Sequence, residues 1–232
     1  MRFIAIIFTL FSYFSVTAQT INNNTNNTTS HKNITEIDIQ NSFTSCEISD
    51  EIFARIKGLS YNDACTTPLS SLRYITVLHY NGNGEICTGE MICHHSISDD
   101  LLEIFRTLFD AHYPIEKMEL IDNFNAQDDL SMLANNSSAF NFRYISGTKK
   151  LSSHSLGLAI DINPLYNPYV KQTSTKTIVS PSESINYVDR SRTFPYKIDH
   201  DDLCYKEFIK HGFIWGGDWS SVKDYQHFEK KL

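Results

Sequence analysis

Residues 151–168 read LSSHSLGLAIDINPLYNP, and this stretch decides how the C-terminal half of the chain folds. His154 precedes Asp161 by seven positions, with Gly157 between them and Pro164 beyond. A helix over 154–161 is disfavoured, because glycine and proline both interrupt helices. In a straight strand, this spacing would put the two side chains on opposite faces. The sequence therefore predicts His154 in a turn at Gly157, and Asp161 on the strand that follows.

A second stretch, WGGDWSSVKDYQHFEKKL at residues 215–232, carries the same residue types. Asp224 precedes His227 by three positions, and in a regular strand their side chains would again point to opposite faces. We therefore expect Asp224 at a strand entrance or a bulge, and His227 on the last strand of the chain.

The two stretches together hold the residue types of a catalytic zinc site. Such a site takes three protein ligands from histidine and carboxylate side chains and keeps a fourth position for water. His154, Asp161 and His227 supply that set, and Asp224 can accept the proton of the water. Zinc also polarises carbonyl groups, so peptide-bond hydrolysis follows from this set. The alternative is that these histidines are structural, as we expect for the other histidines of the chain.

The rest of the chain predicts a mixture of helices and strands. Helices are expected at 49–60, 98–112 and 201–212, with Ser49 and Ser98 as N-caps and Gly58 and Gly212 at the ends. A β-hairpin is expected around NGNG at 81–84, with further strands at 117–122, 139–146, 156–163 and 224–230, and a long loop at 171–200. This order favours the α+β class, with a small antiparallel β-sheet and flanking helices.

The N-terminal region predicts an exported protein. Residues 1–18 have a basic start, an apolar run and small residues at the end, which is the pattern of a signal peptide. An uncleaved anchor is the alternative. Residues 19–44 are expected to form a disordered leader, because the first part of this segment is rich in Asn and Thr. Residues 45–232 then form a single domain, located in the periplasm or outside the cell with no stable membrane insertion.

The net charge and the cysteines carry predictions about binding partners and disulfide bonds. The net charge of −7 argues against a nucleic-acid partner, since phosphate contacts need a basic surface. Export would allow disulfides, and among the five cysteines we expect Cys46 to pair with Cys65. Cys87 and Cys93 fall on one expected strand, about 20 Å apart, which is too far for a bond. We expect a monomer.

Three segments resemble one known family. SSHSLGLAIDINPLYNPYV at 152–170 resembles the S-x-H-x-x-G-x-A-x-D signature of the zinc D-alanyl-D-alanine carboxypeptidases of the VanY-like type. GFIWGGDW and DYQHFE resemble the C-terminal block of that family, and DDLSMLANNSSAFNFR resembles its segment before the zinc motif. The resemblance covers about residues 70–230. It implies the fold shared by these carboxypeptidases and hedgehog domains, one bound Zn²⁺, and a substrate among the stem peptides of peptidoglycan.

The resemblance also implies a role for individual residues. His154, Asp161 and His227 would bind zinc, and Asp224 would be the general base, where some members have Glu. Arg143 would hold a substrate carboxylate or the developing oxyanion, and Ser152 would make a supporting or substrate hydrogen bond. For Arg143 the alternative is a surface salt bridge.

Four further residues near these segments have simpler readings. Trp215 and Trp219 would either line the cleft or pack in the core. Asp128 and Asp129 are expected to be solvated turn residues.

Two functions remain open at this point. The first is an exported zinc peptidase that cleaves either a terminal D-Ala-D-Ala bond or an internal L-Ala-D-Glu bond. The second is a catalytically idle zinc-containing module that binds cell-wall peptide or a protein. The presence of Asp224 favours the enzyme. A serine hydrolase is disfavoured, because no G-x-S-x-G pattern occurs.

Overall fold

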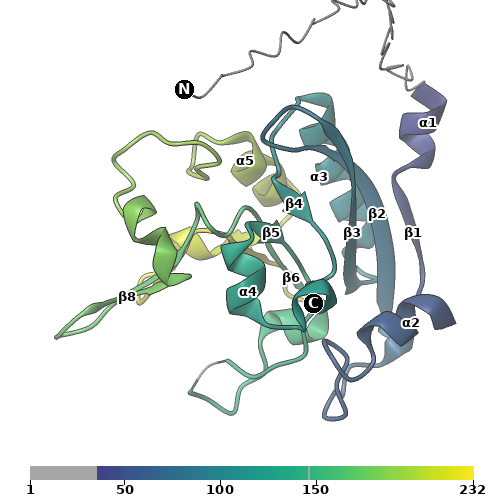
Figure 1. The fold of residues 1–232 in the computed structure, drawn as a ribbon, viewed down its shortest axis with the longest axis horizontal. Helices are drawn as coiled ribbons and strands as arrows, with labels where there is room; N and C mark the ends of the chain where they lie inside the picture. The colour runs from purple at the N-terminus through teal and green to yellow at the C-terminus, as the bar shows by residue number, and fades with distance from the viewer. Residues whose placement is uncertain (1–35, 146) are drawn as a thin grey trace, which may run out of the picture. The chain divides into compact units, whose positions relative to one another are not determined.

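The computed structural model describes residues 36–145 and 147–232, which all belong to one compact unit (Figure 1). Its helices are α1 (Glu36–Asn41), α2 (Asp50–Ile56), α3 (Ser98–Asp110), α4 (Asp128–Leu133) and α5 (Leu203–Lys210). Its strands are β1 (Thr44–Glu47), β2 (Leu72–Tyr80), β3 (Ile86–His94), β4 (Lys117–Met118), β5 (Asn136–Ser137), β6 (Ala159–Asp161), β7 (Tyr169–Gln172), β8 (Thr177–Ser180), β9 (Ile214–Trp215), β10 (Lys223–Asp224) and β11 (His227–Glu229).

The largest sheet is the antiparallel β1–β2–β3, and it contains the expected hairpin. Side chains alternate between its two faces because the strand period is two. Ile75 and Val77 point into a cluster with α3, whereas Leu72 and Ile92 belong to a second cluster that α2 covers. Figure 1 shows α3 running along this sheet. The prediction of an α+β fold with antiparallel strands and flanking helices is thus confirmed at this level.

Two smaller antiparallel sheets carry the C-terminal motifs. One has the order β6–β11–β9 and the other β10–β7–β8, while β4 and β5 form a parallel pair. Ile160 of β6 and Phe228 of β11 are fully buried in the same cluster as Phe105 of α3 and Phe208 of α5. The strands with the candidate ligands therefore belong to the main hydrophobic core, which holds them rigid.

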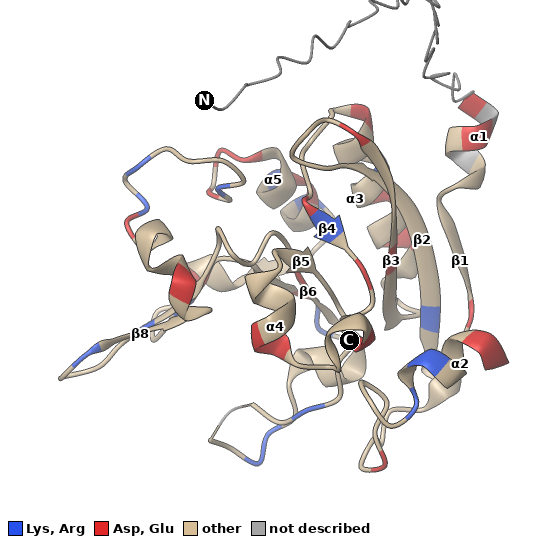
Figure 2. Cartoon of the chain, in the orientation of Figure 1, with Lys and Arg blue, Asp and Glu red and all other residues tan. Residues whose placement is uncertain are grey.

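Most helix ends follow the sequence signals. Ser49 Oγ accepts a hydrogen bond from Ile52 N at 3.3 Å, and Gly58 and Gly212 follow α2 and α5 with positive φ. The prediction for Ser98 is wrong: the N-cap of α3 is Ile97, and Ser98 lies in the first turn, where its hydroxyl donates to His95 O. Figure 2 shows acidic residues at the starts of α1, α2 and α4, where the helix dipole favours negative charge.

No strand forms over residues 139–145, although the alternating pattern predicted one at 139–146. The backbone N–H groups of Phe140, Asn141 and Phe142 donate to Ile92 O, His154 O and Ser60 O respectively. These three acceptors belong to different segments, so the residues cannot form a ladder with one neighbouring strand. The alternation instead reflects Phe140 and Phe142 packing into the second hydrophobic cluster.

The predicted loop at 171–200 is more ordered than expected. It contains the end of β7, all of β8 and a 3₁₀ helix at Ser182–Tyr187. The expected single strand at 224–230 is divided, because β10 pairs with β7 whereas β11 pairs with β6 and β9. Tyr225 and Gln226 connect the two short strands.

The expected Cys46–Cys65 disulfide is wrong, since all five cysteines lie in the described residues and all are free. Cys46 is exposed on β1 opposite Tyr74, whereas Cys65 packs against the second hydrophobic cluster with its Sγ 3.8 Å from Thr67 O. Cys87 and Cys93 both lie on β3, as expected.

The described residues cover only part of the N-terminal region for which predictions were made. The predicted signal peptide lies outside the described residues. Helix α1 falls inside the predicted leader, so the ordered part of the chain begins before residue 45. No helix in the described ranges has the length and apolar character needed to cross a bilayer.

Candidate metal centre

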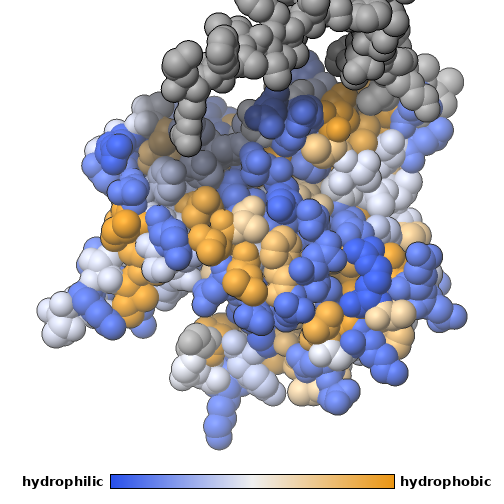
Figure 3. Space-filling view, viewed as in Figure 1, coloured by the Kyte–Doolittle hydropathy of each residue, from blue (hydrophilic) through white to orange (hydrophobic). Residues whose placement is uncertain are grey.

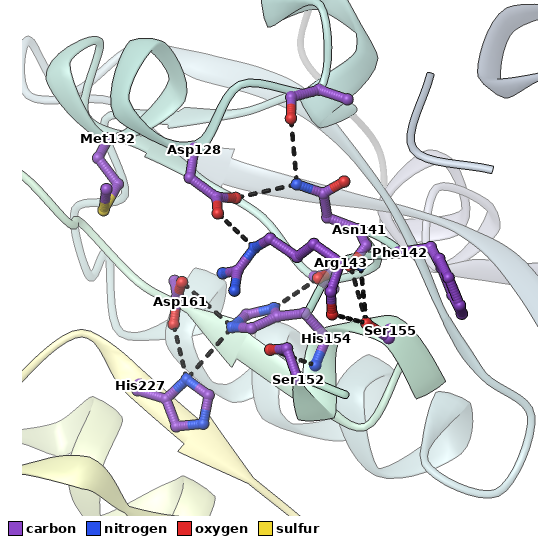
Figure 4. Close-up of polar contacts among 12 residues, drawn as sticks. Asp128, Met132, Asn141, Phe142, Arg143, Ser152, His154, Ser155, Asp161 and His227 are labelled. Atoms are coloured by element: carbon purple, nitrogen blue, oxygen red, sulfur yellow. Dashed lines mark hydrogen bonds and ion pairs between the residues drawn. The ribbon is translucent and has the colours of Figure 1, made fainter. Parts of the chain in front are cut away.

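Three polar side chains from separate elements meet in one buried cluster (Figure 4). His154 Nε2 lies 3.2 Å from His227 Nδ1 and 3.3 Å from Asp161 Oδ2. His227 Nδ1 lies 3.1 Å from Asp161 Oδ1. All three residues are buried, with exposed fractions of 4%, 9% and 6% for His154, Asp161 and His227. The structure thus brings together the residues that the sequence predicted as a ligand set.

The residue types and their spacing fit a zinc site. The two imidazole nitrogens lie 3.2 Å apart, and Asp161 presents Oδ1 to His227 and Oδ2 to His154. With one ligand atom from each residue, all three atoms lie within 4.8 Å of one another. Catalytic zinc sites take three such ligands from histidine and carboxylate side chains and keep a fourth position for water, so these residues could hold the ion.

His154 reaches the cluster from a 3₁₀ helix, Ser153–Leu156, that has fixed ends. At the start, Ser152 Oγ accepts a hydrogen bond from His154 N at 3.3 Å. At the end, Gly157 adopts a φ of 68°, and a Cβ atom there would lie 2.7 Å from His94 N. Only glycine fits, because the φ is left-handed and a backbone atom fills the space of a side chain. The predicted turn at His154 is therefore confirmed.

Asp161 and His227 face each other across two strands. Asp161 ends β6, His227 begins β11, and the antiparallel register pairs the two residues directly. Directly opposed residues in an antiparallel pair point to the same face, with Cβ atoms about 5 Å apart. The prediction that Asp161 lies on the strand after the turn is confirmed, and the register explains how the carboxylate meets the imidazole.

Each histidine has an oriented far nitrogen. His154 Nδ1 lies 2.6 Å from the backbone oxygen of Ala139, so it donates there and leaves Nε2 for the cluster. His227 presents Nδ1 to the cluster, and its Nε2 lies 3.5 Å from Glu229 Oε2. Such contacts fix the ring orientation of metal-binding histidines.

Charges inside the cluster lower the pKa of Asp161 and raise the pKa of His227. Burial opposes ionisation of Asp161, but the charges and hydrogen bonds of His154 and His227 outweigh burial and hold the pKa of this carboxyl well below its usual range. Burial likewise opposes the charged form of His227, yet its contacts with Asp161 and Glu229 raise the pKa of the imidazole to about 10. The site is therefore built to hold positive charge beside Asp161.

Asp224 lies at the end of β10, paired with Tyr169 of β7. Burial, together with the negative charge of Asp161, raises the pKa of Asp224 to about 6, although the nearby His227 acts in the other direction. Its Oδ1 atom is buried and has no hydrogen-bond partner among the described residues. A carboxylate with a raised pKa and a free buried oxygen is suited to accept a proton. Asp224 was expected at the entrance or a bulge of the last strand; it instead ends a separate short strand, with two residues between it and β11, and its role as a base stays a prediction.

Arg143 approaches the cluster from the loop before the 3₁₀ helix. Its Nε forms an ion pair with Asp128, the first residue of α4, and Asn141 Nδ2 donates to the same carboxylate at 2.9 Å. Figure 4 shows the guanidinium between Asp128 and Asp161. The expectation that Asp128 is a solvated turn residue is wrong, because this carboxylate holds Arg143. The salt bridge that was the alternative reading of Arg143 exists, and it orients the guanidinium toward the cluster.

Of the two tryptophans, one packs in the core and the other lies beside the cluster. Trp215 is buried in the main core, with its Nε1 donating to Tyr225 O at 2.9 Å. Trp219 is partly exposed, and its ring centroid lies 5.2 Å from that of His227. Trp219 therefore lies next to the cluster, whereas Trp215 belongs to the hydrophobic core.

Two nearby residues were missed by the sequence analysis. Glu229 follows His227 by two positions in a strand, so the period of two could have placed both side chains on one face. Gln226 is buried between Asp224 and His227, and its Nε2 lies 3.4 Å from Met132 Sδ of α4. No local signal marked Gln226, because its contact with α4 depends on the tertiary fold.

Comparison with known proteins gives a match to the C-terminal part of the chain. Residues 146–230 match a family model described as D-alanyl-D-alanine carboxypeptidase. The matched segment contains all three members of the cluster and Asp224, so the resemblance indicated by the sequence signature is confirmed. Arg143 and α4 lie before the matched segment. Neither a curated protein nor a solved structure matches the chain.

Proposed function

We propose that this chain, whose residues 146–230 match the D-alanyl-D-alanine carboxypeptidase family model, is a zinc-dependent peptidase of peptidoglycan stem peptides. The observation that carries the proposal is the buried cluster of His154, Asp161 and His227, with separations of 3.1 to 3.3 Å. Zinc bound there would polarise the scissile carbonyl and lower the pKa of a water molecule. Signal-peptide cleavage and export would bring the protein to its substrate.

Asp224 supplies the base in this proposal. Its buried Oδ1 has no competing hydrogen bond, and its raised pKa of about 6 makes it a stronger proton acceptor than an exposed aspartate. The proton that it takes from water can then be passed to the leaving amine. Its side chain is one methylene shorter than glutamate, as in the endopeptidase-like branch of the family.

Arg143 supplies the recognition of negative charge. Asp128 holds Nε, so the two terminal nitrogens remain for a ligand. A fork of N–H groups binds a carboxylate or a developing oxyanion with two parallel hydrogen bonds. Ser152 caps the turn of His154, and a direct contact of Ser152 with substrate stays a prediction.

Helix α4, whose Asp128 pairs with Arg143, also carries exposed apolar side chains. Leu130 and Leu133 are each 44% exposed, and Figure 3 shows apolar side chains on the surface over this helix. Met132 of the same helix contacts Gln226, which follows the base by two residues. A substrate at the cluster would therefore meet Arg143, which Asp128 of α4 holds, and the apolar surface of the same helix, which suits a peptide with small apolar side chains.

The test measures metal content and reaction products together. Wild-type protein and the Asp224→Asn variant are purified, assayed for zinc, and incubated with stem pentapeptides that end in D-Ala-D-Ala. We expect one zinc per chain in both proteins and a kcat about 10²–10⁴-fold lower in the variant, which is the usual contribution of a general base. Asp218→Asn is the matched control, because Asp218 is an exposed carboxylate of the same segment that bonds to His200.

Each outcome of this experiment has a distinct meaning. Release of D-alanine identifies a carboxypeptidase, and cleavage between L-Ala and D-Glu identifies an endopeptidase. Zinc without any product from the wild type favours the alternative function, a catalytically idle binding module. Absence of zinc from the wild-type protein contradicts the ligand assignment itself.

A further inference from the structure

Glu229 lies on the side of His227 that faces away from the cluster. The two residues are separated by one position on β11, so their side chains share a face of the strand. His227 Nε2 lies 3.5 Å from Glu229 Oε2, and the side chains are only 7% and 16% exposed. A carboxylate this well covered, next to an imidazole, is not an ordinary surface charge.

The tautomer of His227 explains what this carboxylate does. Nδ1 is the nitrogen that faces Asp161 and His154, at 3.1 and 3.2 Å, so it is the one that would bind a metal. A neutral imidazole then carries its proton on Nε2. This atom is buried and makes no hydrogen bond among the described residues, and the carboxylate of Glu229 at 3.5 Å is the acceptor within ion-pair distance of it. Glu229 is the acceptor that faces it.

A second contact holds Glu229 itself. The hydroxyl of Ser153 donates a short hydrogen bond to Glu229 Oε2. Ser153 precedes His154 and begins the 3₁₀ helix of that residue. The same carboxylate oxygen therefore connects the element that carries His154 with the strand that carries His227.

The two histidines are supported in different ways. His154 Nδ1 donates to a backbone oxygen, Ala139 O, which no substitution of a side chain removes directly. His227 depends on a side chain. This difference makes the support of His227 accessible to a mutational test, with His154 as an unchanged internal reference.

We propose that Glu229, anchored by Ser153, is a positioning residue that accepts the Nε2 proton of His227 and thereby fixes its tautomer and ring for metal binding. The proposal rests on the proposed function, because it presumes a metal at the cluster. It adds a supporting layer of two residues around one metal ligand. Loss of such a supporting carboxylate typically weakens metal binding about 10–100-fold.

The experiment measures zinc affinity rather than turnover. Wild-type, Glu229→Gln, Glu229→Ala and Ser153→Ala proteins are stripped of metal and titrated with zinc against a chelator of known affinity. We expect about a 10-fold loss for Glu229→Gln, which keeps an acceptor but loses the charge, and about a 100-fold loss for Glu229→Ala. Ser153→Ala should show a smaller loss in the same direction. The absorption spectrum of the Co²⁺-loaded proteins should change in the Glu229 variants, because it reports the geometry of the ligands.

The control is Glu183→Gln, which removes an equal charge from an exposed position and should bind zinc like the wild type. Thermal unfolding of the metal-free proteins establishes that each variant is folded, and Glu229→Gln keeps the side-chain shape if Glu229→Ala does not fold. Wild-type zinc affinity and an unaltered Co²⁺ spectrum in Glu229→Gln and Ser153→Ala would overturn the proposal. Failure of the wild type to bind zinc would instead contradict the proposed function.

Discussion

Buried carboxylates in this protein differ in pKa according to the donors around them. Asp161 is surrounded by imidazoles and stays ionised, whereas Asp224 has few donors and its pKa rises to about 6. Asp202, the half-buried N-cap of α5, is a third case. Its carboxylate accepts hydrogen bonds from Cys204 N at 2.9 Å and from Tyr113 Oη at 3.1 Å, yet burial outweighs these bonds and raises its pKa to about 6.

Asp202 should make the protein less stable as the pH rises from 4 to 6. The folded state then binds more protons than the unfolded state, in which an aspartate titrates near pH 3.9, so the free energy of unfolding falls through this window. The shift corresponds to at most about 3 kcal/mol. Asp202→Asn keeps the capping oxygen and should remove this part of the pH dependence. Urea unfolding at pH 4, 5, 6 and 7 measures it, and a constant difference between the two proteins would contradict the assignment.

At the single-residue scale, chemistry could be predicted where residue type alone restricts function. His154, Asp161 and His227 were predicted as one ligand set because few other combinations of side chains suit zinc, and the structure brings these three together; the role of Asp224 as a base stays a prediction. Asp128 was misjudged because its partner Arg143 is fifteen positions away and the pairing depends on the loop between them. Whether such a carboxylate is solvated or forms an ion pair depends on the tertiary fold.

At the scale of elements, the turn between the 3₁₀ helix Ser153–Leu156 and β6 depends on one glycine. Gly157 ends the 3₁₀ helix of His154, its carbonyl oxygen accepts a hydrogen bond from His94 N at 2.8 Å, and its surroundings leave no room for a side chain. Gly58, after α2, has a similar positive φ of 79° but no atom within 4 Å of the position of a Cβ. A substitution at Gly58 therefore tests backbone strain alone, whereas a substitution at Gly157 adds steric overlap to the strain.

Gly157→Ala should therefore be much more harmful than Gly58→Ala. Alanine in the left-handed region costs about 1–2 kcal/mol, and this is the whole cost expected for Gly58→Ala. At Gly157 the added overlap with His94 N should raise the loss to about 3 kcal/mol or more and weaken zinc binding, since His154 must move. Chemical denaturation and zinc titration of the two variants measure both effects. Equal losses of stability would show that the close packing at Gly157 is unimportant.

The elements that sequence patterns predicted well are those stabilised by their own neighbours. The hairpin β2–β3 and the helices α2 and α5 follow turn and cap residues within a few positions. The segment 139–145 failed because alternation predicts which side chains are buried and says nothing about where the backbone N–H groups find acceptors. The division of the last strand into β10 and β11 failed for the same reason, since the two halves pair with different strands.

At the scale of the whole molecule, one hydrophobic core joins the first sheet to the candidate metal centre. It extends from Cys93 of β3 through α3 to Cys204 of α5 and Phe228 of β11. Both cysteines are fully buried, and burial raises the pKa of each thiol well above its usual value. Their reactivity should thus report the integrity of this core.

Thiol labelling should separate the cysteines into three classes. Cys46 is exposed and should react first in native protein, and the half-buried Cys65 and Cys87 should follow. Cys93 and Cys204 should react only at the rate at which the core opens. In denaturant without reductant, five thiols should be counted by absorbance or mass. A count of three would show that a disulfide exists after all.

The pairing of β10 with β7 has a consequence for how such a protein can diversify. Asp224 comes from the sheet β10–β7–β8, whereas the metal cluster comes from β6, β11 and the 3₁₀ helix before them. Tyr225 and Gln226 join β10 to β11, and residues 162–168 join β6 to β7. The β7–β8 hairpin pairs with the strand that carries Asp224 and contributes no member of the candidate metal cluster. Changes of length or sequence in this hairpin could therefore shift Asp224 while the three candidate ligands keep their own backbone support.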